Sequence, residues 1–317
     1  MLTLQEIEDA ARVVHAAMPP TPQYAWPLLA RRTGCEAWVK HENHTPIGAF
    51  KVRGGLVYMD RLARSARPAG VVSATRGNHG QSIAVGAARA GLPATIVVPH
   101  GNSVEKNAAM RAFGAELVEE GHDFDAARAA AERLARERGL HMVPSFHRDL
   151  VAGVASYGLE LFRAAPPLDA VYVPIGLGSG ICGTIAARDA LSPATKVIGV
   201  VSTGAPAYAL SFAAGKVVAT NSVDTMADGM AVRGPDAEAL AIILEGADRI
   251  VSVSDAEIEA AMRAYFEDTH QVTEGAGAAA LAALLQERAR FAGKRVGLIL
   301  SGGNIDRPVY RRVLAED

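Results

Sequence analysis

The feature that most constrains the fold is a regular alternation of short apolar strands with helices along most of the chain. A first run contains strands predicted at 71–73, 94–98 and 115–118 and helices at 80–90, 103–113 and 123–138. A second run contains strands at 170–173, 196–201, 249–251 and 295–300 and helices at 151–162, 181–190, 205–214, 255–269 and 275–286. Alternation on this scale predicts parallel sheets covered by helices on both faces. We therefore expect an α/β protein with two lobes and a cleft between them.

The composition excludes several classes of protein. A formal net charge of −2 with no dense basic segment argues against a nucleic-acid-binding protein. No apolar run approaches the ~20 residues that a membrane-spanning helix needs. Cys35 and Cys182 lie far apart and have no metal-binding spacing. The first residues predict a helix capped by Thr3 and Glu6 rather than an export signal. These features indicate a cytoplasmic protein that acts on small molecules.

Lys51 is the most informative single residue. It lies in the stretch ENHTPIGAFKVRGG (residues 42–55), where glycine and proline indicate that a loop turns into a helix. Burial and the positive end of a helix dipole both disfavour a charged amine. A neutral lysine amine is the form that reacts with a carbonyl group to give a Schiff base. One lysine alone is a weak signal, because most lysines are solvated and structural.

Three further glycine-rich stretches strengthen this interpretation. They are SATRGNHG (73–80), PIGLGSG (174–180) and LSGGN (300–304), each directly after a predicted strand. In this order and at these separations they resemble the fold type II, or tryptophan-synthase-β-like, pyridoxal-phosphate enzymes. The likeness is strongest to the threonine and serine dehydratase and serine racemase branch. The resemblance implies pyridoxal 5′-phosphate as cofactor, bound through Lys51 in the cleft.

The loop at 174–180 is expected to bind an anion. Gly176, Gly178 and Gly180 leave backbone amides exposed at a helix N-terminus, and Ser179 adds a hydroxyl donor. Taken alone, the pattern also fits a dinucleotide fingerprint or a tight turn. No acidic residue ends the strand at 196–201, which weakens the dinucleotide alternative. The resemblance assigns this loop to the phosphate of the cofactor.

The loop at 75–79 is expected to bind substrate through Thr75, Arg76, Gly77 and His79, while Asn78 donates to the ring oxygen of the cofactor. The alternative is that Asn78 only caps the following helix. Arg76 stands where the family has a small residue, which in serine racemases is a serine that acts as second acid/base. Arginine is a poor proton acceptor, so racemisation is not expected. Arg76 either recognises a second carboxylate or points to solvent.

The remaining predicted cofactor contacts are Ser301, Glu274 and Phe50. The resemblance places the Ser301 hydroxyl at the pyridine nitrogen, where it suits β-elimination. Glu274 begins EGAG (274–277), which resembles a family element beside the cofactor, although a helix N-terminal glutamate is often only a dipole partner. Phe50 is expected to pack on the cofactor or in the core. No metal is expected, because the acids that hold a divalent cation in some relatives are absent from 200–207.

The resemblance also implies the domain organisation and the reaction. Residues 1–50 with 147–317 are expected to form a large cofactor-binding domain, and 51–146 a smaller inserted domain. We expect an ammonia-lyase, or dehydratase, of amino-acid metabolism that acts as a homodimer on threonine or serine. The departures at Ala49 and Arg76 leave 3-hydroxyaspartate and 3-phenylserine open as substrates. A β-replacement enzyme, an amino-acid sensor without turnover and a nicotinamide-dependent dehydrogenase remain as alternatives.

Overall fold

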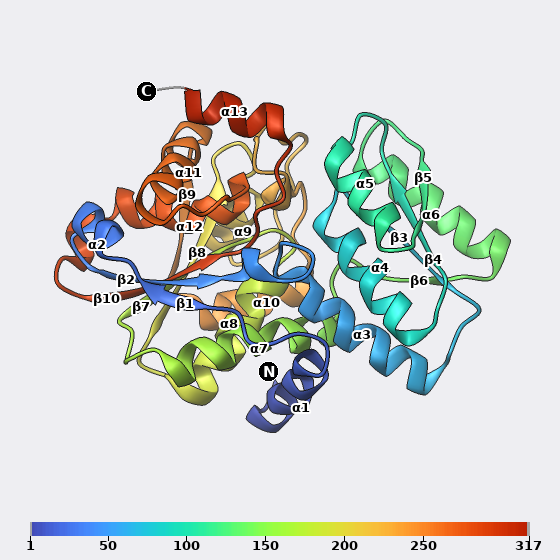
Figure 1. The fold of residues 1–317 in the computed structure, drawn as a ribbon, viewed down its shortest axis with the longest axis horizontal. Helices are drawn as coiled ribbons and strands as arrows, with labels where there is room; N and C mark the ends of the chain where they lie inside the picture. The colour runs from blue at the N-terminus through green and yellow to red at the C-terminus, as the bar shows by residue number, and fades with distance from the viewer. Residues whose placement is uncertain (1, 316–317) are drawn as a thin grey trace.

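The computed structural model describes residues 2–315 and contains two sheets, each flanked by helices (Figure 1). The larger sheet has the order β1-β2-β10-β7-β8-β9. All of its neighbouring strands are parallel except β1 and β2. Its strands are β1 (Gln23–Ala25), β2 (Glu36–His41), β7 (Ala170–Pro174), β8 (Lys196–Ser202), β9 (Arg249–Val253) and β10 (Arg295–Leu300).

The smaller sheet is fully parallel and has the order β5-β4-β3-β6. Its strands are β3 (Val71–Ala74), β4 (Ala94–Val98), β5 (Glu116–Glu119) and β6 (His141–Met142). The helices of this lobe are α3 (Lys51–Ser65), α4 (Asn78–Ala90), α5 (Val104–Ala112) and α6 (Phe124–Arg138). The predicted two-lobed α/β fold is thus confirmed. The domain boundaries at 50/51 and 146/147 stay predictions, and positions 1 and 316–317 of that assignment lie outside the described residues.

Helices cover both faces of the larger sheet because its strands are apolar on both sides. Val171 and Val173 pack in one core with α1, α7, α8 and α10, whereas Ala170 and Tyr172 pack in a second core with α2, α11, α12 and α13. These helices are α1 (Leu4–His15), α2 (Pro27–Thr33), α7 (Arg148–Ala164), α8 (Ser179–Leu191), α10 (Ala237–Gly246), α11 (Asp255–Thr269), α12 (Gly275–Gln286) and α13 (Arg307–Ala315); α9 (Ala207–Ala214) follows β8. None of the helices within 2–315 is long and apolar enough to cross a membrane.

Glycines bring α3 into very close contact with helices of both lobes. A Cβ atom on Gly55 would lie 2.2 Å from the Ser82 hydroxyl of α4, and one on Gly153 of α7 would lie 2.2 Å from the backbone oxygen of Arg53. Only a residue without a side chain allows helix backbones to approach this closely. The helix that begins with Lys51 is therefore held between the two lobes.

Several short elements were not predicted, although the long ones were found at nearly their observed bounds. The sequence prediction missed β1, α2, β6, α10 and α13, and it began α8 two residues late at Ile181. Helix α10 does carry a start signal, because the Asp236 side chain accepts a hydrogen bond of 3.0 Å from the backbone of Ala239. The helix at the N-terminus has the predicted capping box between Thr3 and Glu6.

The close contact of α3 with α7 leads to a prediction about stability. We expect Gly153→Ala to lower the free energy of unfolding by about 1–3 kcal/mol, because the new methyl group must displace the backbone of α3. The matched control is Gly234→Ala, where the nearest atom is 3.9 Å from the added Cβ. Urea denaturation of both variants measures the difference. Equal stabilities would show that α7 can shift away without cost.

Candidate active site

Lys51 begins α3, and its amine lies inside the protein. Its Nζ donates a 3.0 Å hydrogen bond to the hydroxyl of Ser179 and lies 4.9 Å from the ring centre of Phe50. Burial lowers the pKa of Lys51 to about 8, so an appreciable fraction of the amine is neutral near neutral pH. Lysine, phenylalanine and serine, which are far apart in the sequence, therefore meet at one point.

The chain before Lys51 is attached to the end of β10. The backbone N–H of Phe50 donates a 3.0 Å hydrogen bond to the backbone oxygen of Ser301, and Ala49 forms a bridge with Gly302. The Thr45 hydroxyl bonds with both backbone groups of Ala49, at 2.8 and 2.9 Å. Ser301 itself is buried directly after the strand, as predicted. The lysine and this serine are thus held close together by backbone contacts.

The glycine loop at 176–180 joins β7 to α8 and has a conformation that requires glycine. Gly178 has a φ of +105°, which side chains rarely permit, and a Cβ on Gly176 would lie 2.3 Å from the backbone oxygen of Gly229. Gly178 is the N-cap of α8 and has no side chain to occupy the first amides of the helix. These amides and the buried Ser179 hydroxyl form a site that favours an anion.

The second loop, at 75–79, lies between β3 and α4. The Thr75 hydroxyl accepts hydrogen bonds from the backbone of Gly77 at 2.9 Å and Gly80 at 3.2 Å, which leaves its own hydrogen free to donate. His79 has a buried Nε2 with no partner among the described residues. Burial, and then the charge of Lys51, lowers the pKa of His79 to about 3, so this imidazole is neutral.

Asn78 connects this loop to the other lobe. Its Nδ2 donates to Glu274 at 2.6 Å, and its Oδ1 accepts from Asn304 at 2.8 Å. The N-cap of α4 is Gly77 and not Asn78, so the alternative role of Asn78 as a helix cap is wrong. The amide still has one N–H left for a ligand. Burial raises the pKa of Glu274, against the opposing effect of the nearby Lys106.

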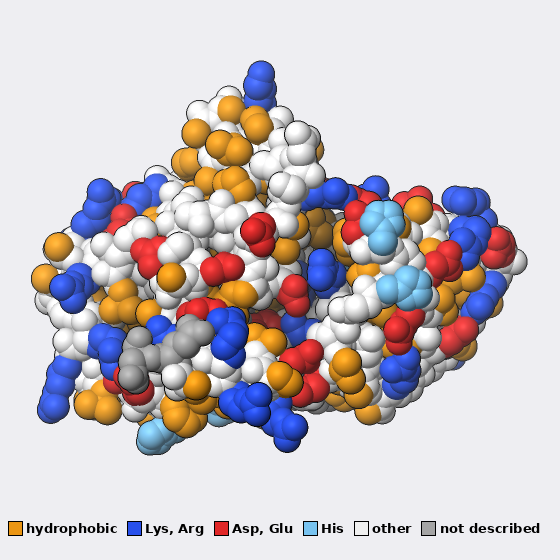
Figure 2. All heavy atoms as spheres, turned by 90° about the horizontal axis from the view of Figure 1, so that it is seen from above, with side chains coloured by type: hydrophobic (Ala, Val, Ile, Leu, Met, Phe, Trp, Pro, Cys, Tyr) orange, Lys and Arg blue, Asp and Glu red, His pale blue; other side chains and the backbone are white. Residues whose placement is uncertain are grey.

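The sequence analysis missed Lys106, Asp228 and Asn304. Lys106 is buried behind Gly77, where a Cβ would lie 2.4 Å from its Cδ, and its Nζ is 3.3 Å from Glu274. A signal was present, since a lysine in the first turn of α5 is disfavoured by the helix dipole and suggests a specific partner. Arg76 lies at the mouth of the cleft and is half-exposed. Figure 2 shows basic and acidic side chains along the hollow between the lobes.

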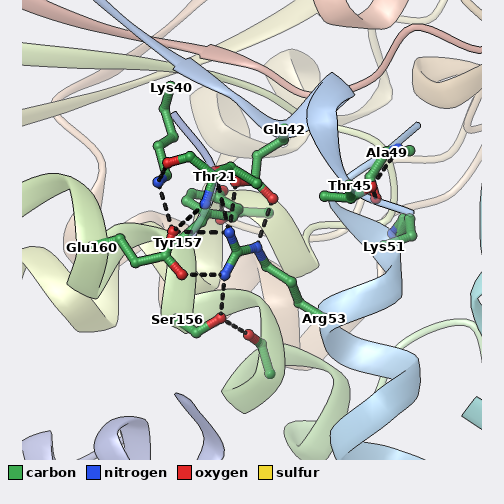
Figure 3. A network of polar contacts seen from close by, with 12 residues as sticks. Thr21, Lys40, Glu42, Thr45, Ala49, Lys51, Arg53, Ser156, Tyr157 and Glu160 are labelled. Carbon is green, nitrogen blue, oxygen red and sulfur yellow. Dashed lines mark hydrogen bonds and ion pairs between the residues drawn. The ribbon is translucent and has the colours of Figure 1, made fainter. Parts of the chain in front are cut away.

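A buried ionic cluster lies behind Lys51 (Figure 3). Arg53, two residues along α3, has no exposed side-chain surface and donates to Glu42 at 2.7 and 2.9 Å and to Glu160 at 2.6 and 2.9 Å. Lys40 donates to Glu160 at 2.6 Å. The two cations and two carboxylates balance in charge, and Arg53 and Lys40 hold the pKa of Glu160 at about 2 against the effect of burial. The cluster joins α3 to β2 and α7.

Comparison with known proteins agrees with this geometry. A family model described as pyridoxal-phosphate dependent enzyme matches residues 14–302. The chain is 35% identical to an L-threonine ammonia-lyase of Thermotoga maritima, covering 99% of this chain and 78% of that one. It is also 35% identical to an L-threo-3-hydroxyaspartate ammonia-lyase of Pseudomonas sp, covering 98% and 97%. A crystal structure of the T.th. threonine deaminase has a TM-score of 0.91 at 33% identity, covering 96% and 99%.

The ionic cluster leads to a second prediction about stability. We expect Arg53→Met to lower the free energy of unfolding by about 3–5 kcal/mol, because two buried carboxylates lose their main partner. Arg64→Met is the control on the same helix, because the Arg64 side chain is 75% exposed and its pair with Asp60 lies at the surface. That change is expected to cost about 0.3–0.5 kcal/mol. Thermal and urea unfolding of the two variants provide the comparison, and similar losses would contradict the prediction.

Proposed function

The chain belongs to the family of pyridoxal-phosphate-dependent enzymes and is a dehydratase of the ammonia-lyase type, and we propose that its substrates are β-hydroxy-α-amino acids such as L-threonine and L-serine. The products are a 2-oxo acid and ammonia. The observation that carries this proposal is the meeting of the buried Lys51 amine with the Ser179 hydroxyl at the N-terminus of α8.

The residues present fit the cofactor. Its phosphate requires several donors, and the loop at 176–180 supplies the first amides of α8 together with the Ser179 hydroxyl. Its aldehyde requires an amine that is partly neutral, and Lys51 has a pKa lowered to about 8 by burial. Phe50 provides an apolar surface beside that amine. We propose that Ser301, Asn78 and Glu274 complete the cofactor site.

The chemistry follows from the positions of these side chains. Bound pyridoxal phosphate supplies an electron sink for the charge that develops at the α-carbon of the substrate. Lys51 is the base that takes the α-proton on its Nζ, since it is the buried amine at the start of α3. The substrate hydroxyl leaves the β-carbon as water. Thr75 and the amides of its loop hold the substrate carboxylate, and neutral His79 supports that loop without adding a charge.

A second candidate substrate is 3-hydroxyaspartate. Arg76 supports it, because this cation extends from the predicted substrate loop to the mouth of the cleft. A relative that the chain matches over nearly its whole length is named for this substrate. The hollow beside the site is lined by charged and amide side chains that include Lys106, Asp228 and Asn304, which favours a polar substrate over 3-phenylserine. A homodimer in the cytoplasm is part of the same proposal and is carried over from the family resemblance.

The role of Lys51 gives a direct test. We expect Lys51→Ala, loaded with pyridoxal phosphate and desalted, to lose the visible absorbance of the cofactor adduct and at least about 10³-fold in ammonia release, because it lacks the base. Lys216→Ala is the control, since Lys216 lies on the surface. Retention of full activity by Lys51→Ala would exclude the mechanism.

The substrate class is tested by measuring ammonia and 2-oxo-acid release from L-serine, L-threonine, threo-3-hydroxyaspartate and threo-3-phenylserine. We expect turnover of the polar substrates to exceed that of phenylserine, because the side chains beside Glu274 and Asp228 favour polar groups. Faster turnover of phenylserine would contradict the assignment of the pocket. Cofactor binding with no release from any of the four would favour the sensor or β-replacement alternatives.

A further inference from the structure

Two cations of the small lobe converge on one carboxylate of the large lobe at the mouth of the cleft. The Arg76 Nε lies 3.8 Å from one oxygen of Asp228, and the Lys106 Nζ lies 3.7 Å from the other. Both distances exceed the ~3.2 Å limit of a good N–H···O hydrogen bond. Asp228 is therefore attracted by both cations without being hydrogen-bonded to either.

Both cations belong to the substrate loop or pack against it. Arg76 is part of the loop at 75–79, and the methylene stem of Lys106 lies directly behind Gly77. Lys106 is 9% exposed, whereas Arg76 and Asp228 are 41% and 39% exposed. The two positive charges thus keep a fixed relation to the predicted site of the α-carboxylate, while Asp228 lies on the opposite lobe with room to turn toward solvent.

We propose that Arg76 and Lys106 form a subsite for a second carboxylate, carried on the β-carbon of the substrate, and that Asp228 occupies this subsite when the substrate has none. The proposal rests on the proposed function and names the substrate class of the same site. A substrate carboxylate can accept charge-assisted hydrogen bonds of ~2.7–2.9 Å from an ammonium or guanidinium group. Asp228 then turns outward, so the residue acts as an internal competitor that sets the preference for dicarboxylic substrates.

The other charges around the subsite are consistent with this exchange. Glu274 is 3.3 Å from Lys106 and is held by Asn78, and burial raises its pKa, which favours loss of its negative charge. Asp306 accepts a 2.5 Å hydrogen bond from Ser103 at the far side of the pocket. The surroundings therefore do not cancel the two cations once Asp228 has moved.

The test compares two ligands of nearly equal shape that cannot eliminate a hydroxyl. The cofactor-loaded protein is titrated with L-aspartate and with L-asparagine, and the change in cofactor absorbance gives a dissociation constant for each. We expect aspartate to bind about tenfold more tightly than asparagine, the factor expected from one charged hydrogen bond. Arg76→Gln is expected to reduce this ratio to about threefold or less. Asp228→Asn is expected to raise it, because the competitor is lost.

The matched control is Arg233→Gln. Arg233 is 40% exposed and pairs with Asp125 and Asp123 across the lobes, outside the pocket. Equal loss of the ratio in Arg76→Gln and Arg233→Gln would show a long-range charge effect and overturn the subsite. Equal affinities for aspartate and asparagine, a lower ratio in Asp228→Asn, or no spectral response to either amino acid would also overturn it. A normal preference for aspartate without ammonia release from any hydroxy amino acid would instead reject only the proposed function.

Discussion

The structure depends on the neutralisation of one buried guanidinium group. Arg53 is inaccessible to solvent and must be paired, because an isolated charge in the protein interior costs several kcal/mol. Its partners Glu42 and Glu160 come from the segment after β2 and from α7. These segments can satisfy the guanidinium only in one arrangement, and that arrangement also fixes the start of α3. The reactive amine of Lys51 is positioned as a result.

The parallel sheets supply the rest of the geometry. The glycine loop follows β7, the substrate loop follows β3, and Ser301 follows β10, so all three begin at the carboxyl ends of strands. In α/β proteins this edge is where ligands bind, because helix N-termini and loops meet there. The two lobes are then joined across the cleft by polar side chains, of which Asn78 is the central one. Apolar strands thus set positions, and a few polar groups set the chemistry.

The sequence predicted those parts of the molecule that depend on local pattern. Strand–helix alternation and the glycine loops gave the fold and the positions of Lys51, Ser179 and Ser301, because each follows a strand or begins a helix. The pairing of Arg53 with Glu160 could not be predicted, since these residues are separated by 107 positions and meet only through tertiary packing. Lys106 was missed for the same reason: its partner is on the other lobe.

The contact between Gly176 and the backbone of Gly229 has a consequence for thermodynamic linkage. The phosphate-binding loop and the irregular segment that carries Asp228 pack with no side chain between them, so neither can move far without the other. A ligand that holds the loop must lower the freedom of that segment, and any group that holds the segment must raise the affinity of the loop by the same factor. Retention of the cofactor and selection of the substrate are in this way two readouts of a single equilibrium.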